Sequence, residues 1–219
     1  MLRLIPLLFI LLLSAVSCSK NGTSTSTDDS VMKTNIQPSP KTGHKNVLIL
    51  SSSPRRGGNS ETLCLQFKKG AEEAGHTVEM INLNDFDIRY FNQREYDREA
   101  SAAETDDAAY IISKMKSADV IVLSSPVYFY NMTAQLKALI DRTYGHEKDL
   151  KEKEFFYIAT STDRDEEATD AVFEAFNGFA RCLYGSIERG VIRGNGVRGR
   201  GDIDSHPAVR QAYDMGKGV

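Results

Sequence analysis

Short apolar runs alternate with longer amphipathic stretches along the chain from residue 46 onward. The runs predict five strands, at Val47–Leu50, Thr77–Leu83, Asp119–Ser124, Phe155–Ala159 and Ile187–Ile192. The stretches that alternate with them predict helices at Ser60–Ala74, Asp106–Lys116, Met132–Tyr144, Glu166–Leu183 and Pro207–Met215. Apolar strands separated by helices predict an α/β doubly wound domain, a parallel sheet covered on both faces that binds ligands at the carboxyl ends of its strands.

The first 45 residues are expected to lie outside this domain. A positive start, the apolar run Leu4–Leu13 and a small-residue segment predict a secretory signal peptide over residues 1–17. Residues 18–45 are rich in Ser and Thr with almost nothing apolar to bury, which predicts a flexible tether. Residues 46–219 then form one domain.

Cys18 follows the predicted cleavage point directly. The run Leu13-Ser14-Ala15-Val16-Ser17-Cys18 resembles the lipobox of bacterial lipoproteins, which implies lipidation of Cys18, although Ala15 stands where that pattern prefers Leu. An ordinary signal peptide followed by a chance cysteine is the alternative. Lipidation would hold the domain on a membrane of a bacterial cell envelope.

A polar loop, Ser51–Ser60, follows the first predicted strand and leads into a helix. Its glycines let the backbone turn N–H groups inward, and a helix N-terminus favours an anion. Arg55 or Arg56 can supply charge, and the neutral donors are Ser53, Asn59, Ser60 and Thr62. The Lys of G-x-x-x-x-G-K-[ST] is missing, so a monophosphate suits the loop better than a triphosphate. Ser60 is also predicted as the N-cap of the following helix, and the alternative is that it is only an N-cap and the rest of the loop a polar turn.

A second loop, Ser124–Thr133, follows the third predicted strand and carries Tyr128, Phe129 and Tyr130. Strands one and three end side by side at the switch point of a doubly wound sheet, so this loop should lie beside the polar loop and could pack against a flat ring. Asn131 or Thr133 should cap the following helix. The alternative is an aromatic cluster that covers the sheet edge.

These two loops carry a resemblance. Ser53-Pro54-Arg55-Arg56-Gly57-Gly58-Asn59-Ser60 is similar to the phosphate loop of the flavodoxin-like NAD(P)H-dependent FMN reductases, and Ser125-Pro126-Val127-Tyr128 with the run Asn131–Arg142 resembles their flavin loop and following helix. The resemblance spans residues 46–219 and implies a five-stranded sheet in the order 2-1-3-4-5. It implies FMN held at the phosphate by Ser53, Arg55, Asn59 and Ser60 and at the isoalloxazine by Ser125, Pro126, Val127, Tyr128, Phe129 and Asn131, with Thr160 and Ser161 in a third loop.

The implied function is an oxidoreductase in which FMN does the chemistry and no catalytic side chain is singled out. Electrons would come from NAD(P)H or a membrane donor and pass to a small acceptor such as a quinone, an azo or nitro compound, or a metal chelate. Tyr128, Tyr130 and the segment Arg89–Glu104 are candidates for shaping the acceptor pocket. A homodimer is an expected assembly. An electron carrier that docks to proteins and a flavin-less interaction module are the alternatives.

Other signals predict less. The net charge is −3 and no stripe of basic residues occurs, which argues against a nucleic-acid-binding surface. The four His are scattered and do not show the spacing of metal ligands. No cysteine follows the second predicted strand, where one branch of the resembled family carries an iron–sulfur cluster, so none is expected. The run Gly194–Gly199 matches G-x-G-x-x-G, but no helix is predicted to open on it. Cys64 and Cys182 are predicted as small buried hydrophobes, with a bridge between them as the alternative.

Overall fold

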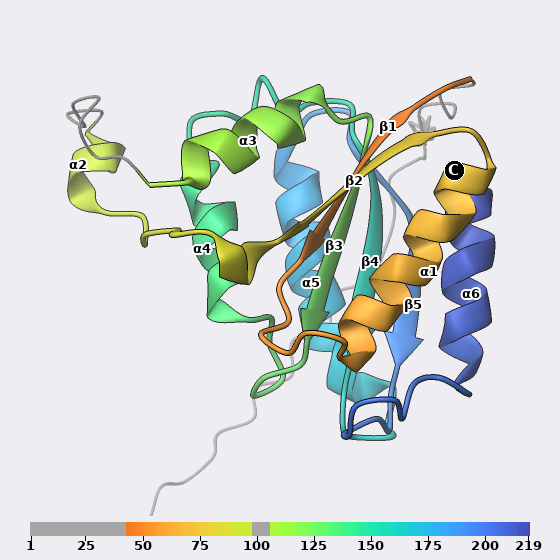
Figure 1. The fold of residues 1–219 in the computed structure, drawn as a ribbon. Coiled ribbons are helices and arrows are strands. Elements are labelled where there is room, and N and C mark those ends of the chain that lie inside the picture. The colour runs from red at the N-terminus through yellow and green to blue at the C-terminus, as the bar shows by residue number, and fades with distance from the viewer. Residues whose placement is uncertain (1–42, 98–105) are drawn as a thin grey trace, which may run out of the picture. The chain divides into compact units, whose positions relative to one another are not determined.

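A computed structural model describes residues 43–97 and 106–219 of the chain. These residues hold a five-stranded parallel sheet in the order β2-β1-β3-β4-β5 (Figure 1), which confirms the predicted flavodoxin-like, doubly wound sheet and its order. The strands are β1 (Asn46–Ser51), β2 (Thr77–Asn82), β3 (Val120–Pro126), β4 (Glu154–Thr160) and β5 (Ile187–Gly194). The predicted signal peptide, Cys18 and most of the tether lie outside the described residues.

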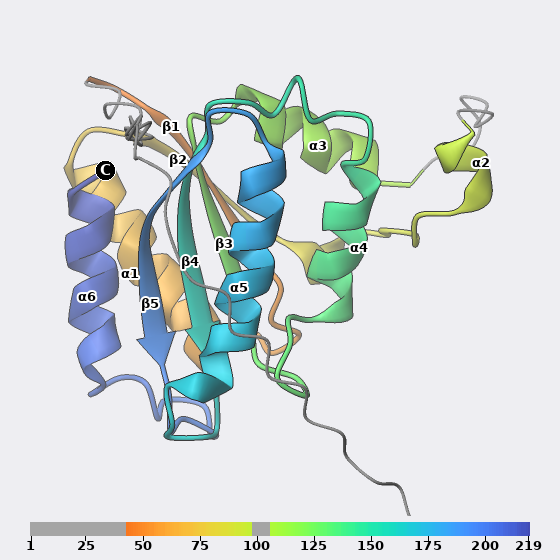
Figure 2. The same cartoon turned by 180° about the vertical axis from the view of Figure 1, so that it is seen from behind.

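Helices cover both faces of the sheet (Figures 1 and 2). The helices α1 (Asn59–Glu73) and α6 (Pro207–Lys217) lie side by side on one face, and α3 (Ala108–Ser117), α4 (Ala134–Arg142) and α5 (Glu167–Cys182) lie on the other. Between β2 and α3 come two short helical segments, η1 (Leu83–Asp85) and α2 (Gln93–Tyr96), which are too short to show a helical period in the sequence. No helix within the described residues has the length and apolar character that crossing a membrane requires.

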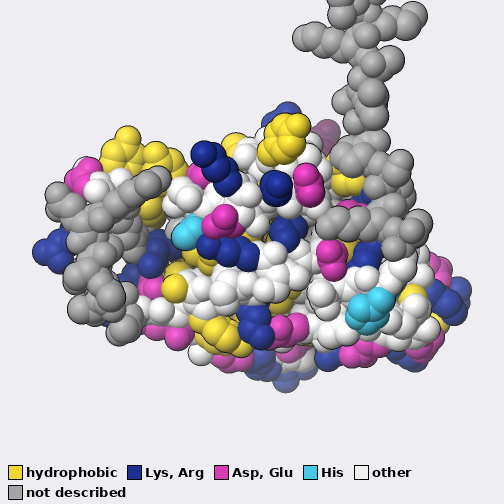
Figure 3. Space-filling view, turned by 90° about the horizontal axis from the view of Figure 1, so that it is seen from above, with side chains coloured by type: hydrophobic (Ala, Val, Ile, Leu, Met, Phe, Trp, Pro, Cys, Tyr) yellow, Lys and Arg dark blue, Asp and Glu magenta, His cyan; other side chains and the backbone are white. Residues whose placement is uncertain are grey.

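Two apolar cores result, one on each face of the sheet. Successive strand residues point to opposite faces, so Ile49 and Val122 pack with α1 and α6 while Leu50 and Leu123 pack with α3, α4 and α5. The sheet is therefore buried on both sides, which explains why its strands are nearly continuous apolar runs. Seen from the end where the strands begin, the surface mixes acidic and basic side chains (Figure 3).

The helices α1 and α6 approach each other closely at two glycines. A Cβ at Gly70 would overlap the carbonyl oxygen of Tyr213, and one at Gly216 would overlap the carbonyl oxygen of Phe67. Each helix thus lacks a side chain where the other helix's backbone comes nearest. This crossing places α6 against α1, whose first turn borders the polar loop.

The segment between β2 and α3 is attached to the body by a buried ion pair. Arg142 donates from Nη2 to Oδ1 of Asp106 at 3.1 Å, and the backbone N–H of Arg89 donates to Oδ2 of Asp106 at 3.0 Å. Burial alone would raise the pKa of Asp106, but these donors outweigh it and hold the pKa below its usual range. The Asp106 side chain is 2% exposed, so this buried pair ties the backbone at Arg89 and the residues just before α3 to α4.

Helix starts differ from the predicted ones by up to two residues. The helix predicted from Met132 begins at Ala134, because Thr133 has an extended backbone and Met132 turns into the core. The helix predicted from Ser60 begins at Asn59, with Gly58 as its N-cap. The prediction that Ser60 is the N-cap is therefore wrong, and the hydroxyl of Ser60 is available for another contact.

Candidate functional site

Loops from the carboxyl ends of β1, β3, β4 and β5 meet at one edge of the sheet (Figure 1). A hollow of about 60 Å³ lies among them. Its walls come from all four loops and consist of Ser53, Arg55, Gly58, Asn59, Ser60, Pro126, Val127, Tyr128, Thr160, Thr162, Val197 and Arg198. The hollow is close to the size of a single phosphate group and lies where a doubly wound fold binds its ligand.

The polar loop after β1 forms the part of the wall that a phosphate group would contact. Gly57 has a φ of +60°, a conformation that favours glycine, and a Cβ at Gly58 would come within 3.0 Å of the carbonyl oxygen of Arg55. Helix α1 begins next, so the N–H groups of its first turn have no acceptor within the helix and the positive end of its dipole faces an anion. The amide of Asn59 is buried, and within the described residues its Oδ1 has no hydrogen-bond partner. That oxygen is an acceptor, so the donors open to an anionic ligand are the N–H groups of the first turn, which also lie at the positive end of the helix dipole.

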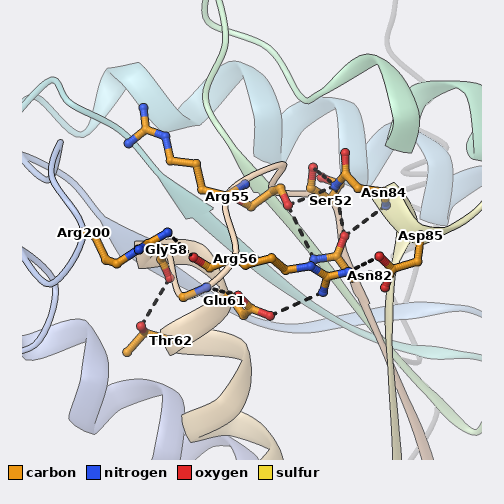
Figure 4. A network of polar contacts seen from close by, with 12 residues as sticks. Ser52, Arg55, Arg56, Gly58, Glu61, Thr62, Asn82, Asn84, Asp85 and Arg200 are labelled. Carbon is orange, nitrogen blue, oxygen red and sulfur yellow. Dashed lines mark hydrogen bonds and ion pairs between the residues drawn. The ribbon is translucent and has the colours of Figure 1, made fainter.

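Side chains brace this loop from outside (Figure 4). Arg56 forms ion pairs with Asp85 and Glu61, and Glu61 also accepts from the backbone N–H of Gly57. Arg200 donates to the carbonyl oxygen of Arg56 at 2.7 Å. Asn84 donates from Nδ2 to the carbonyl oxygens of Ser53 at 2.9 Å and Ser52 at 3.3 Å. The loop is therefore held in shape by protein contacts alone.

The two arginines of the loop have different positions. Arg56 is occupied by the carboxylates of Asp85 and Glu61. Arg55 lines the hollow and donates from Nη1 to the carbonyl oxygen of Arg198 at 2.7 Å. Of the pair, Arg55 is the arginine placed to face a bound anion.

Ser60 and Thr160 join two of the loops. Their hydroxyl oxygens lie 2.6 Å apart and both residues are buried, so the start of α1 is tied to the end of β4. The backbone N–H of Val127 donates to the carbonyl oxygen of Thr160 at 2.8 Å, which ties the loop after β3 to the same point. Thr160 is thus a shared anchor for three of the four loops.

The aromatic loop after β3 is a tight turn. Tyr128 and Asn131 exchange backbone hydrogen bonds of 2.8 and 3.0 Å, and the two residues between them, Phe129 and Tyr130, have left-handed φ values of 51° and 59°. Non-glycine residues rarely adopt this conformation, so the surrounding contacts must hold it. Phe129 is fully exposed and projects from the turn, while Tyr128 lines the hollow.

Ser125 and Asn131 secure the base of that turn. Ser125 Oγ donates to the carbonyl oxygen of Pro126 at 2.7 Å and accepts from the backbone N–H of Thr133 at 3.0 Å. Asn131 Oδ1 accepts from the N–H of Met132 at 2.8 Å. Of the two residues predicted to cap α4, Asn131 and Thr133, it is Thr133 that occupies the N-cap position. Its side chain makes no capping hydrogen bond.

Eight of the thirteen predicted site residues line the hollow and five do not. Those that line it are Ser53, Arg55, Asn59, Ser60, Pro126, Val127, Tyr128 and Thr160. Thr62 bonds back to the carbonyl oxygen of Gly58 inside α1, Ser161 accepts from the N–H of Asp163, and Ser125, Phe129 and Asn131 belong to the aromatic turn as described. These five shape the loops around the hollow.

Four lining residues were not among the predicted site residues: Gly58, whose part was only to let the loop turn, and Thr162, Val197 and Arg198. Val197 and Arg198 lie in the stretch that matches G-x-G-x-x-G, and as predicted no helix begins there, since α6 starts only at Pro207. Their position after β5 was the signal that could have found them, because the rule on carboxyl ends applies to every strand of the sheet.

The cysteines differ from the prediction in one respect. Cys64 is buried, as predicted, and burial raises the pKa of its thiol to about 12 against the opposing effect of the Ser124 and Ser51 hydroxyls. Cys182 is exposed, so its prediction as a buried hydrophobe is wrong, and both thiols are free. No cluster of His, Cys, Asp or Glu suited to a metal ion occurs within the described residues.

This geometry fits the phosphate end of a mononucleotide at the edge of a flavodoxin-like sheet. The chain matches the NADPH-dependent FMN reductase family over residues 45–186, and it belongs to that family. FMN is the cofactor that this membership supports. The braced loop and the unpaired N–H groups in the first turn of α1 are the features that fit a phosphate.

The relatives are flavoproteins. An iron–sulfur flavoprotein of Methanocaldococcus jannaschii is 38% identical over 98 residues, which are 44% of this chain and 51% of that protein. One of Archaeoglobus fulgidus is 33% identical over 104 residues, which are 46% of this chain and 47% of that protein. The chain therefore spans about half the length of the curated relatives that it matches.

Solved structures share the fold. An NAD(P)H:quinone oxidoreductase from Methanothermobacter marburgensis superposes with a TM-score of 0.65 at 19% identity, covering 80% of this chain and 96% of that one. An azoreductase from Bacillus anthracis superposes with a TM-score of 0.64 at 14% identity, covering 80% of this chain and all of that one. At sequence identities this low, the similarity to these structures shows a shared fold.

Proposed function

We propose that this protein is an FMN-dependent oxidoreductase that passes electrons from a reduced donor to a small acceptor. The observation that carries the proposal is the phosphate-sized hollow beside a loop that Asn84 and Arg200 hold in shape. A loop that is already shaped loses little conformational entropy when it binds, so it favours tight retention of a cofactor. Membership of the FMN reductase family and the quinone and azo reductases among the structural neighbours support this class of reaction.

The chain's own residues would bind and orient the cofactor. Asn59, Ser60 and the N–H groups of the first turn of α1 would hold the phosphate, with Arg55 as the nearby cation. The backbone of residues 126–131 would position the ring, and the exposed turn at Phe129 would limit access of water to one side. When bound, FMN supplies the transfer of hydride or single electrons.

FMN is proposed as the only redox group. The relatives named above are iron–sulfur flavoproteins, but this chain has three cysteines in all, at 18, 64 and 182. Cys64 is enclosed in the core with a raised thiol pKa, whereas Cys182 lies at the surface at the end of α5. The described residues therefore offer no set of thiolates for a cluster.

A flavin spectrum of the purified protein tests the function directly. We expect bound FMN with absorption bands in the visible range, which anaerobic dithionite bleaches and a small quinone restores. The same sample is then given NADH and NADPH to compare donors. Absence of flavin from the protein, even after incubation with FMN, would contradict the proposal.

We further propose a lipid anchor at Cys18 that keeps the domain in the envelope of a bacterial cell. Support comes from the sequence of residues 1–18 alone, since these residues lie outside the described part. Cys18→Ser should move the protein from the membrane fraction to the soluble envelope fraction. Continued sedimentation with membranes would refute the anchor and leave the flavin function untouched.

A further inference from the structure

The loop between β5 and α6, residues 195–206, contacts the polar loop after β1, although the two loops follow strands that are not neighbours. In the sheet, β3 and β4 lie between β1 and β5. The β5–α6 loop therefore meets the polar loop across the ends of β3 and β4, at the edge where the phosphate-sized hollow lies. It also lies beyond residue 186, where the match to the FMN reductase family ends.

Two arginines join these loops in opposite directions. Arg55 of the polar loop donates from Nη1 to the carbonyl oxygen of Arg198 at 2.7 Å. Arg200 of the β5–α6 loop donates from Nη2 to the carbonyl oxygen of Arg56, also at 2.7 Å. The Arg200 side chain runs along Gly57, where an added Cβ would lie 3.7 Å from its Nε. Each loop thus gives a guanidinium to the backbone of the other, and these two contacts form the arginine bridges.

Neither bridging guanidinium is neutralised by a carboxylate. Within residues 43–97 and 106–219, Arg55 and Arg200 form no ion pair, whereas arginines elsewhere pair with carboxylates, among them Arg142, Arg189, Arg193 and Arg210. Figure 4 shows Asp85, the partner of Arg56, on the opposite side of the loop from Arg55 and Arg200. Two positive charges beside one loop favour a bound anion, which would offset their mutual repulsion.

The start of the β5–α6 loop is held by the loop after β4. The N–H of Gly196 donates to the carbonyl oxygen of Asp163 at 2.7 Å, and the N–H of Val197 donates to that of Ser161 at 2.9 Å. The Val197 side chain is buried in the core on the α1 side of the sheet. The β5–α6 loop is thus attached to two other loops, and with them it surrounds the hollow.

We propose that the β5–α6 loop, held by the arginine bridges, closes the phosphate end of the flavin site, an inference that rests on the proposed function. Val197 and Arg198 line the hollow, which is close to the size of one phosphate group. The flavin ring is proposed at residues 126–131, so a group attached beyond the phosphate would leave between the loops after β1 and β5, which the bridges join. The site therefore takes a flavin that ends in a monophosphate and excludes FAD.

The same closure sets how long the cofactor stays. A phosphate enclosed by four loops leaves only when the β5–α6 loop moves aside, so the bridges act mainly on the rate of dissociation. FMN then remains bound through many reaction cycles and does not exchange as a substrate would. Arg200 acts on the ligand through the backbone of Arg56, so it is a positioning residue, while Arg55 also faces the anion.

Arg200→Ala removes one bridge without changing a residue that lines the hollow. The FMN dissociation rate, followed by the recovery of flavin fluorescence after dilution, should rise about ten- to a hundredfold, the effect expected for a charged hydrogen bond. Arg200→Lys, which can still donate to the carbonyl oxygen, should restore part of the retention. Arg210→Ala, which removes an exposed arginine of α6, is the control and should release FMN at the wild-type rate.

FAD tests the closed end directly. The wild type should bind FMN more tightly than FAD, and Arg200→Ala should bring the two affinities closer by about tenfold, because the second phosphate of FAD can displace the loosened loop. The Arg210→Ala control should discriminate as the wild type does. Equal affinity of the wild type for FMN and FAD, or the same ratio in Arg200→Ala, would overturn the closed end.

Hydrogen exchange of the flavin-free chain tests the bridges without the cofactor. The N–H groups of Arg198 and Gly199 donate to Oδ2 of Asp202 at 2.9 and 2.6 Å, so they are protected only while the loop keeps this shape. Inorganic phosphate, compared with chloride at equal ionic strength, should slow exchange over residues 195–206 in the wild type. In Arg200→Ala, exchange there should be faster and indifferent to phosphate, while exchange over β3 and the unfolding temperature stay at their wild-type values.

These measurements separate the closure from the flavin function. Exchange over residues 195–206 that is equal in the wild type and Arg200→Ala would overturn the closure, and so would equal FMN dissociation rates. Phosphate-dependent protection in a chain that takes up no FMN would support the closure of an anion site by this loop and refute the proposed function.

Discussion

Arg55 and Arg56 are adjacent in the sequence, yet only Arg55 lines the phosphate-sized hollow. Charged hydrogen bonds contribute roughly 1.5 to 3 kcal/mol each. We therefore expect Arg55→Ala combined with Asn59→Ala to weaken FMN binding by several kcal/mol without unfolding the protein, as measured by titration of flavin fluorescence. Arg210→Ala, a loss of another exposed arginine on α6, is the control and should leave FMN affinity unchanged. Equal affinity of the double variant and the wild type would remove the phosphate-loop assignment.

Asp106 provides a prediction on pH. Its lowered pKa means that the folded chain favours the ionised carboxylate, so this contribution to stability is complete above the ordinary pKa of about 4 and is lost as the pH falls through the lowered pKa. Asp106→Asn should destabilise the fold by about 1 to 3 kcal/mol at pH 7. Thermal unfolding should show that the difference from the wild type shrinks towards pH 3.

Asp149→Asn is the control for this pH series. The pKa of Asp149 is also lowered, first by a hydrogen bond from Lys116, but both side chains are at the surface. Water screens such a pair, so its removal should change the unfolding temperature much less than Asp106→Asn does. An equal effect of the two variants at every pH would contradict the role given to the buried pair.

Local chemistry allowed some of these residues to be predicted and hid others. The glycines, hydroxyls and arginines of the loop after β1 indicate an anion site because few other structures need that combination. Ser60 was misplaced as an N-cap because its partner, Thr160, is a hundred residues away and no local pattern reports the contact. Arg198 and Thr162 follow the fifth and fourth strands, so the rule on carboxyl ends places their loops at this edge of the sheet, but no local pattern shows that these two side chains face the hollow.

At the scale of elements, the spacing of apolar residues along the chain predicted all five strands and the five long helices. It did not predict how the helices cross. Gly70 and Gly216 permit the close approach of α1 and α6, and no side-chain movement can relieve a clash with a backbone oxygen. Gly70→Ala should therefore destabilise the protein by about 1 to 3 kcal/mol. Gly178→Ala in α5, where an added Cβ meets nothing within 4 Å, should be neutral or stabilising by up to about 1 kcal/mol. Denaturant unfolding of both variants checks this contrast, and equal effects would contradict the close crossing.

At the scale of the whole molecule, the described chain begins at the end of the sheet where the strands start, and the proposed flavin site lies at the opposite end. Lys45 donates to the carbonyl oxygen of Val219 and pairs with Glu154 at the edge where the strands start. A strand of six residues spans about 20 Å, so an anchor before residue 43 would attach the domain on the side away from the hollow. The proposed tether, about 30 Å in its mean extension, would let the domain turn its site towards the membrane.

This arrangement leads to a prediction on the electron donor. Nicotinamide cofactors are kept in the cytoplasm, so an anchored envelope protein should be reduced slowly by NADPH and faster by membranes that contain a quinol. Stopped-flow reduction of one sample by each donor measures the two rates, and deletion of residues 25–38 should slow only the membrane reaction. Fast, saturable reduction by NADPH with none from membranes would contradict the prediction.

Cys64 is a buried residue of α1 in the core between this helix and the sheet. Its thiol is protonated at any pH the protein is expected to meet, so a thiol reagent can react only when this part of the core opens. Cys182, at the surface, reacts without any opening. The delay between the labelling of Cys182 and that of Cys64 therefore reports how often the core between α1 and the sheet opens, with no probe added to the chain.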